Sequence, residues 1–231
     1  MSSLVIVCTG CVSICADDIE GYESSYPAQL DPFTGNWKGE WVEGDEKDPW
    51  LAAQIIPLGK YKYRITLTNL LDARCPSIFT IEAEANGDRL TFNDKTVFGT
   101  IERGEFTGGK VKEDDRFRLE RVELSSPTLG APPPRDAVVL FDGSNLDAFS
   151  RPRGWVISPE GTLLVTPKSP DVLTAEKFSS VQMHLEFRLP YRPDKRGQDR
   201  GNSGVFLQNH YEIQILDSFG LEGNYDECGA V

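Results

Sequence analysis

The sequence has few cysteines beyond its first 16 residues and no long apolar run after them. Only Cys75 and Cys228 follow residue 16, one in each half of the chain, so no disulfide framework and no zinc-type spacing is available. We expect both thiols to be buried or half-buried. A membrane-spanning helix needs about 20 apolar residues in a row, so none is predicted.

Positive charge is the scarcer sign. Lys and Arg total 24 against 36 Asp and Glu, which gives a net charge of -12. Binding to nucleic acid depends on contacts of Lys and Arg with phosphates, so the composition predicts no nucleic-acid partner. An acidic surface also disfavours strongly anionic substrates, whereas it does not exclude neutral sugars as substrates.

The N-terminus predicts an export signal. Apolar residues dominate from Leu4 to Ala16, directly before two aspartates, although no Lys or Arg precedes them. We interpret residues 1–16 as a signal peptide cleaved after Ala16, with a lipid anchor at Cys11 as the alternative leader and a cytosolic tail as the remaining one. The leader predicts an extracytoplasmic protein that is periplasmic, attached to the cell surface or secreted.

Residues 31–124 predict a small all-β domain. Short segments of alternating polar and apolar residues are separated by turn residues, a pattern typical of antiparallel strands. Roughly six to eight strands of this length favour a small antiparallel barrel or sandwich. We expect Trp37, Trp41, Tyr61 and Tyr63 to be core residues, and no catalytic group is predicted here. The predicted strands are 37–41, 61–67, 78–83, 89–92, 96–101 and 117–122.

Residues 125–136 predict a linker between two domains, because their prolines cannot donate a full ladder of hydrogen bonds. Residues 137–231 again alternate in the manner of strands, and neither an internal repeat nor a convincing amphipathic helix is found. The whole chain is therefore predicted to be all-β. The strands predicted in this second domain are 138–141, 155–157, 162–165, 181–188, 203–208 and 211–216.

Polar side chains recur on one face of three of these predicted strands. Side chains two apart in a strand point to the same face. If the strands are neighbours, carboxylates, Arg and carboxamides form one patch suited to sugar hydroxyls; the alternative is that these faces merely contact water. The residues are His184, Glu186 and Arg188 in the first strand, Asn202 and Gln208 in the second, and Glu212 and Gln214 in the third.

Residues 137–231 resemble the N-terminal part of the 3-keto-disaccharide hydrolase family. The motifs that carry the resemblance follow one another in the family's order: 140–146, Trp155 with 161–163, 184–188, 201–208, 211–218 and 228–230. The resemblance implies a concanavalin-like jelly-roll β-sandwich with its site on the concave sheet. The family's domain continues past the Gly-Ala-hydrophobic motif, so we expect an incomplete domain, following the small barrel or sandwich.

The resemblance implies hydrolysis of glycosidic bonds in 3-keto-disaccharides or 3-keto-glycosides. A ketone at C3 acidifies the C2 proton, so a carboxylate can remove it before the C1 group leaves and water adds. No cofactor is certain; a divalent ion held by carboxylates is an alternative Lewis acid. On this hypothesis Glu186 or Glu212 is the base, Arg188 and Gln214 stabilise negative charge, and Asn202, Gln208, Asp217 and His184 hold an oligosaccharide or glycoside.

Two rival functions are open at this stage. A classical glycoside hydrolase needs two carboxylates about 5 Å apart or somewhat farther. Glu212 and Asp217 are the candidates, but in a regular strand they point to opposite faces, so a bulge would be required. The other rival is a lectin-like module that binds glycans without cleaving them, since a fold does not determine a function.

Overall fold

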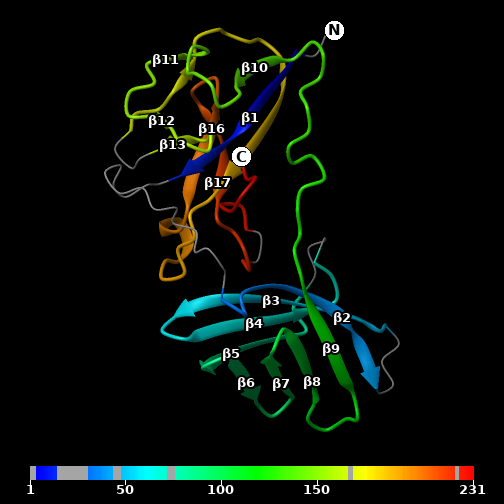
Figure 1. Ribbon diagram of the computed structural model, residues 1–231. Helices are drawn as coiled ribbons and strands as arrows, with labels where there is room; N and C mark the ends of the chain where they lie inside the picture. The colour runs from blue at the N-terminus through cyan, green and yellow to red at the C-terminus, as the bar shows by residue number, and fades with distance from the viewer. Residues whose placement is uncertain (1–3, 15–30, 44–47, 72–75, 166–168, 222–223) are drawn as a thin grey trace.

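The computed structural model describes residues 4–14, 31–43, 48–71, 76–165, 169–221 and 224–231, with side chains described from residue 31 onward. Within these ranges the regular structure consists of strands and one turn of 3-10 helix, η2 (Gly197–Asp199). The all-β prediction is confirmed. A closed barrel is followed along the chain by a second group of strands, and the first strand of the chain joins this second group (Figure 1).

The first domain is an eight-stranded antiparallel barrel in which each strand pairs with its neighbours in sequence. Pairing of the first strand with the last closes it, so no edge is left open. This confirms the predicted barrel. Its strands are β2 (Gly35–Glu43), β3 (Trp50–Gly59), β4 (Lys62–Thr68), β5 (Phe79–Asn86), β6 (Arg89–Asn93), β7 (Val97–Glu102), β8 (Glu105–Lys110) and β9 (Arg116–Val122).

Strands β3 and β8 are absent from the sequence prediction for two physical reasons. Strand β3 is buried on both faces around Ala52, Ala53 and Ile56, so its apolar residues run together without alternating. Strand β8 contains Gly108 where a side chain would collide with the ring of Phe117. The glycine permits the close approach of that ring, but it interrupts the alternation of polar and apolar residues by which a strand is predicted.

Aromatic side chains fill the barrel. Trp37, Phe106 and Phe117 are fully buried, and Phe106 meets the other two rings edge to face, with centroids 5.9 Å and 5.2 Å away. Trp41 packs against this cluster and Tyr63 is buried in it, as predicted. Tyr61 is not a core residue: it lies in the turn between β3 and β4 with φ 64° and is 76% exposed.

The described residues of the second domain, together with the strand Leu4–Ile14, form three sheets. A five-stranded sheet contains β10 (Val138–Phe141), β1 (Leu4–Ile14), β13 (Leu163–Val165), β12 (Val156–Ile157) and β15 (Val181–Arg188). Two further pairs are β11 (Phe149–Ser150) with β14 (Leu173–Thr174), and β16 (Asn202–Leu207) with β17 (Tyr211–Leu216). Strands β15 and β17 have the bounds that the sequence predicted.

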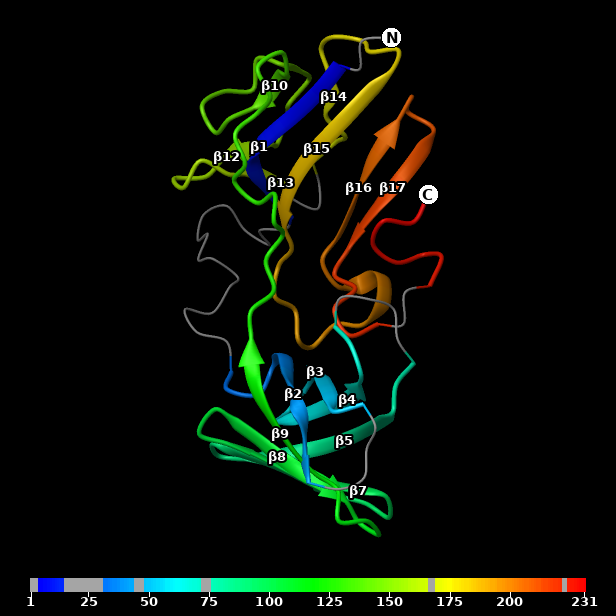
Figure 2. The same cartoon turned by 90° about the vertical axis from the view of Figure 1, so that its right-hand side faces the viewer.

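The five-stranded sheet and the β16–β17 hairpin enclose a second core. Phe141 of β10, Leu163 of β13 and Ile215 of β17 are buried together. Leu185 of β15 and Val205 of β16 pack against them. Two sheets that share one core are the arrangement of a sandwich, consistent with the predicted β-sandwich; Figure 2 shows the hairpin beside β15.

Strand β1 lies inside the predicted export signal. It runs parallel to β15 on one edge and to β10 and β13 on the other, and among the described strands it is the one that joins β15 to this sheet. The cleavage position after Ala16 lies outside the described residues, and the export signal stays a prediction. Cleavage would leave the edges of β15 and β10 without this partner.

Candidate functional site

The polar residues predicted to form one patch are divided between two surfaces. Among the described strands β15 pairs with β1, while β16 and β17 pair with each other. Strand β15 is therefore not paired with β16 by backbone hydrogen bonds among the described strands. One group lies on β15 and the other on the β16–β17 hairpin.

On β15 the predicted face is confirmed, because His184 and Glu186 point together and away from Leu185 in the core. The His184 Nε2 and Glu186 Oε1 atoms are 3.2 Å apart. The backbone N–H of Gly130, in the linker, donates to the same carboxylate oxygen at 2.6 Å. The Glu186 side chain is only 11% exposed. This carboxylate therefore holds the linker against the outer face of β15.

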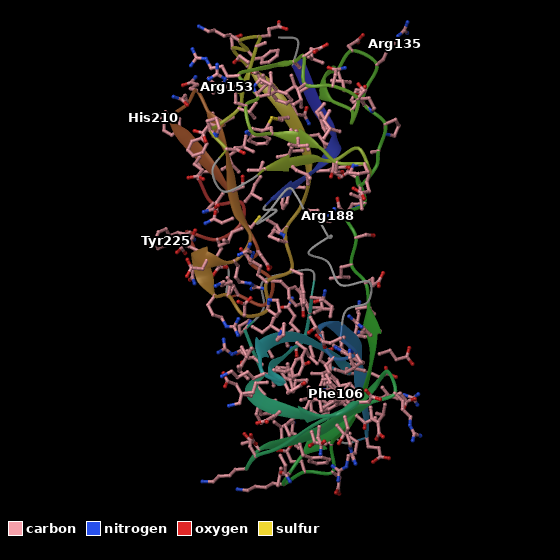
Figure 3. All side chains as sticks on the ribbon, turned by 60° about the vertical axis from the view of Figure 1, so that its left-hand side comes forward. Phe106, Arg135, Arg153, Arg188, His210 and Tyr225 are labelled. Atoms are coloured by element: carbon pink, nitrogen blue, oxygen red, sulfur yellow. The ribbon has the colours of Figure 1, made fainter. Side chains whose placement is uncertain are left out.

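Arg188 ends β15 and is half-buried at the lower end of that strand in the view of Figure 3. Its positive charge acts on the Glu160 carboxyl, in the loop between β12 and β13. The pKa of the Glu160 carboxyl lies below its usual value, first because the Ser158 hydroxyl donates to it and to a smaller extent because of the Arg188 charge. Arg188 thus contributes to a favourable field at Glu160.

The hairpin carries the second group on the face that points away from the core. Gly204 lies opposite Gln214, and Phe206 lies opposite Glu212. A Cβ at Gly204 would collide with the Glu212 carboxylate, so the glycine gives this carboxylate room to lie across β16. Glu212 is exposed, which leaves it open to a ligand.

Three side-chain amides form a hydrogen-bonded cluster at the end of this face that lies next to η2. The Gln198 side chain, from η2, accepts from Asn202 Nδ2 at 2.8 Å and from Gln214 Nε2 at 3.3 Å, and its own Nε2 donates to the Asp226 carbonyl at 2.9 Å. Gln214 Oε1 is buried and accepts no hydrogen bond within the described residues. An unsatisfied buried acceptor costs about 1–3 kcal/mol.

Gln198 is the member of this cluster that sequence reasoning missed. It lies in an irregular segment between two strands, where no alternation indicates which way a side chain points. Asn202 and Gln214 were predicted from alternation and lie where predicted. Sequence position alone carried no signal for Gln198, because its partners are brought to it by tertiary packing.

Two predicted substrate ligands are placed differently. Gln208 lies beyond the end of β16, exposed in the hairpin turn with φ 55°, and not on the face of Asn202. Asp217 Oδ2 lies 2.9 Å from Arg200 Nη2, and both side chains are largely buried. Asp217 is therefore engaged in an internal ion pair, and the described strand brings no bulge that would pair it with Glu212.

The C-terminal motif borders the amide cluster through its backbone. Gln214 N–H donates to the Ala230 carbonyl at 2.9 Å, and Gly229 N–H donates to the Gln214 carbonyl at 2.8 Å. Cys228 is exposed, so the expectation of a buried thiol is wrong for it. The turn that places Gly229 against β17 directs the preceding residue outward. Cys75 lies outside the described residues.

In the part of the chain that the structure describes, no three His, Cys, Asp or Glu side chains gather in a way that could hold a metal ion. The divalent ion stays a hypothesis. The described residues also include no helix of the length and apolarity needed to span a membrane.

Of the comparisons with known proteins, the scan against protein families gives a match in the second domain. Residues 136–231 match the model of a family described as 3-keto-alpha-glucoside-1,2-lyase-like domain, which confirms the predicted resemblance and places this part of the chain with carbohydrate-related, hydrolase-like domains. The search of curated proteins gave no match. A solved structure of the siderocalin Ex-FABP, described as functioning through dual ligand specificities, is 14% identical over 43% of this chain and 80% of that chain, with a TM-score of 0.24. So weak a likeness implies nothing about ligands of this chain.

Proposed function

We propose that the second domain cleaves the glycosidic bond of 3-keto-disaccharides or 3-keto-glycosides. The observation that carries the proposal is the outer face of the hairpin, where the Glu212 carboxylate lies across Gly204 next to the amides of Asn202 and Gln214. It lies within the residues that match a family described by a lyase reaction on 3-keto-glucosides. A carboxylate beside hydrogen-bonding amides suits proton removal from a bound sugar.

Glu212 is the better candidate for the base. It is exposed on the outer face of the hairpin. Glu186 is largely buried and already accepts the Gly130 N–H, with His184 at its side. A base must come within hydrogen-bond reach of the proton it removes, so the accessible carboxylate is favoured. We assign Glu186 to holding the linker.

The reaction balances as elimination followed by hydration. Glu212 takes the C2 proton, and the electrons of the C2–H bond form an enolate with the C3 carbonyl. The enolate collapses to a C1=C2 double bond as the C1–O bond breaks, and the leaving oxygen takes a proton from protonated Glu212 or from water. Addition of water across C1=C2 yields the free 3-keto sugar, so the net reaction is hydrolysis.

The amide cluster supplies binding and charge stabilisation. Gln214 and Asn202 are oriented by Gln198 and are positioned to bind sugar oxygens. Amide N–H groups aimed at a developing enolate oxygen stabilise it more in the transition state than in the ground state. We assign this task to Gln214 in preference to Arg188, since Arg188 lies on β15 and not on the hairpin. His184 has its hydrogen-bond partner in Glu186.

The test uses the full-length protein with 3-keto-trehalose or a 3-keto-glucoside, and measures release of 3-keto-glucose. We expect Glu212→Gln to lower the rate about 100-fold or more, since loss of a general base costs that much. Glu186→Gln is the matched control and is expected to change the rate only a few-fold. Loss of activity in Glu186→Gln with retention in Glu212→Gln would transfer the role of base to Glu186.

Two further arms separate the alternatives. A chelator that abolishes release would add a divalent ion to the mechanism. Cleavage of the unoxidised parent sugars at the same rate would indicate an ordinary glycoside hydrolase instead. If neither kind of sugar is cleaved but both bind, the domain is a glycan-binding module and the catalytic assignment is wrong.

We also propose an extracytoplasmic location, supported by the apolar leader that ends at Ala16. Expression in a secreting bacterial host followed by intact-mass measurement tests it. The expected mature chain begins at Asp17 or, for the lipoprotein alternative, at a lipidated Cys11. A cytosolic chain that keeps Leu4–Ile14 would contradict the proposal and leave those residues available as β1.

A further inference from the structure

Phe206 is an exposed aromatic residue directly opposite the proposed base. It pairs with Glu212 across the hairpin and is 49% exposed. The preceding residue, Val205, packs into the core. Because successive side chains in a strand alternate, the Phe206 ring emerges on the face that carries Glu212.

The surroundings of the ring differ along the hairpin. On the side of the amide cluster the next residue on this face of β16 is Gly204, which has no side chain. Gln214 lies opposite it on β17, and Asn202 lies beyond it on β16. The ring therefore borders a flat stretch of backbone crossed by the Glu212 carboxylate. An apolar surface, a carboxylate and amides lie side by side on one exposed face.

A pyranose ring has chemistry complementary to this face. The face of an aromatic ring carries partial negative charge and attracts the partially positive C–H groups on the apolar side of a sugar. The hydroxyls at the sugar's rim need donors and acceptors at the edge of such a platform. The exposed Glu212 carboxylate, which lies across Gly204, is one such acceptor.

We propose that Phe206 is a stacking platform for the pyranose ring from which Glu212 removes the C2 proton, and thus a specificity-determining residue. The inference rests on the proposed function, which it extends by one substrate contact. Stacking fixes the plane of the sugar, and the cross-strand pairing holds the carboxylate at the edge of that plane. Binding of the sugar then also orients its C2–H bond toward the base.

The test compares Phe206→Ala with Tyr211→Ala in the full-length protein. Tyr211 is the matched control, because it is exposed to a similar extent, 55%, but lies on the opposite face of the same hairpin. With a 3-keto-glucoside we expect Phe206→Ala to raise KM about tenfold, Phe206→Tyr to keep it within about twofold, and Tyr211→Ala to leave it unchanged. The melting temperature of each variant reports whether it folds.

Direct binding separates the failure of this inference from the failure of the proposed function. Saturation-transfer NMR with the same glycoside measures contact of its C–H protons with the protein. If the wild type cleaves the sugar but Phe206→Ala changes neither KM nor the NMR transfer, the platform is wrong and the enzyme stands. If no sugar is cleaved, transfer that is lost in Phe206→Ala and kept in Tyr211→Ala supports the platform alone. Absence of transfer in the wild type overturns it.

Discussion

The Tyr191 hydroxyl of the second domain donates to Asp31 Oδ2 at the barrel at 3.3 Å. The same aspartate accepts the backbone N–H groups of Phe33 and Thr34 at 2.9 Å and 2.8 Å and the Thr34 hydroxyl at 2.6 Å. Asp31 therefore ties the entry of the barrel to the segment between β15 and β16. The two domains also meet where Gly220 leaves room for Ile56 of β3.

A double-mutant cycle measures this link between the domains. Tyr191→Phe and Asp31→Asn are each expected to lower the free energy of unfolding, with a coupling of about 1 kcal/mol, the net value of one hydrogen bond. Asp31→Asn is expected to lower the free energy of unfolding more than Tyr191→Phe, because Asp31 also accepts hydrogen bonds from Phe33 and Thr34. Urea denaturation followed by tryptophan fluorescence is the measurement. Strictly additive effects would show that the bond contributes nothing.

The interface is expected to weaken at high pH. Burial, followed by the charges of Asp31 and Tyr191, raises the pKa of Tyr63 to about 12 from 10.0. Between about pH 10 and 12 the Tyr63 hydroxyl therefore keeps its proton in the folded state but loses it in the unfolded chain. The contribution of Tyr63 to the free energy of unfolding is fully present below pH 10 and falls as the pH rises toward 12. The loss is on the order of 2 kcal/mol.

Denaturation at a series of alkaline pH values checks this slope. Tyr63→Phe removes the phenol and is expected to flatten the decline between pH 10 and 12. The control is Tyr61→Phe, in the exposed turn two residues earlier. A decline as steep in Tyr63→Phe as in the wild type would assign the effect to other groups, Tyr191 first, since burial also raises the pKa of Tyr191.

The Arg200–Asp217 ion pair is expected to be structural. Its side chains are 11% and 16% exposed, and Arg200 Nη1 also donates to the Phe219 carbonyl at 3.0 Å. Asp217→Asn leaves a largely buried guanidinium without its counter-charge, so we expect a loss of about 3 kcal/mol. The exposed pair of Arg118 and Glu105 is the control; Glu105→Gln is expected to cost less than about 1 kcal/mol.

Thermal denaturation of both variants distinguishes this role from a direct one in substrate binding. A stable Asp217→Asn with a strongly raised KM would restore Asp217 as a ligand of the sugar. A destabilised variant whose folded fraction keeps the normal KM is the expected result.

The linker is expected to loosen when Glu186 is removed. Glu186→Ala deletes the acceptor of the Gly130 N–H bond and frees the adjacent Leu129, itself 62% exposed, to enter a protease site. We expect cleavage at Leu129 by thermolysin to become several-fold faster. Glu176→Ala, which removes an exposed carboxylate elsewhere in the domain, is the control. Equal cleavage rates in all three proteins would show that Glu186 does not hold the linker.

Local alternation was enough to predict much of this structure. Six of the eight barrel strands, and the faces of β15 and β17, follow from side chains that point alternately to core and solvent. The pattern fails where that contrast is missing, as in β3, which is buried on both faces, and in β8, where Gly108 makes room for a ring. Asn202, Glu212 and Gln214 were found because they obey the alternation.

Which strands become neighbours was decided by tertiary structure, because pairing joins backbone groups that are far apart in the chain. Alternation could not show that β15 would pair with β1, or that Glu186 would be occupied by a linker N–H. Nor could alternation predict that Gln198 contacts Gln214 or that Asp217 pairs with Arg200, because these contacts depend on an irregular loop. The sequence alone established the all-β class, the second domain's family resemblance and the residue types of the site, because local pattern and composition encode them. Which of those residues face one another was set by long-range packing.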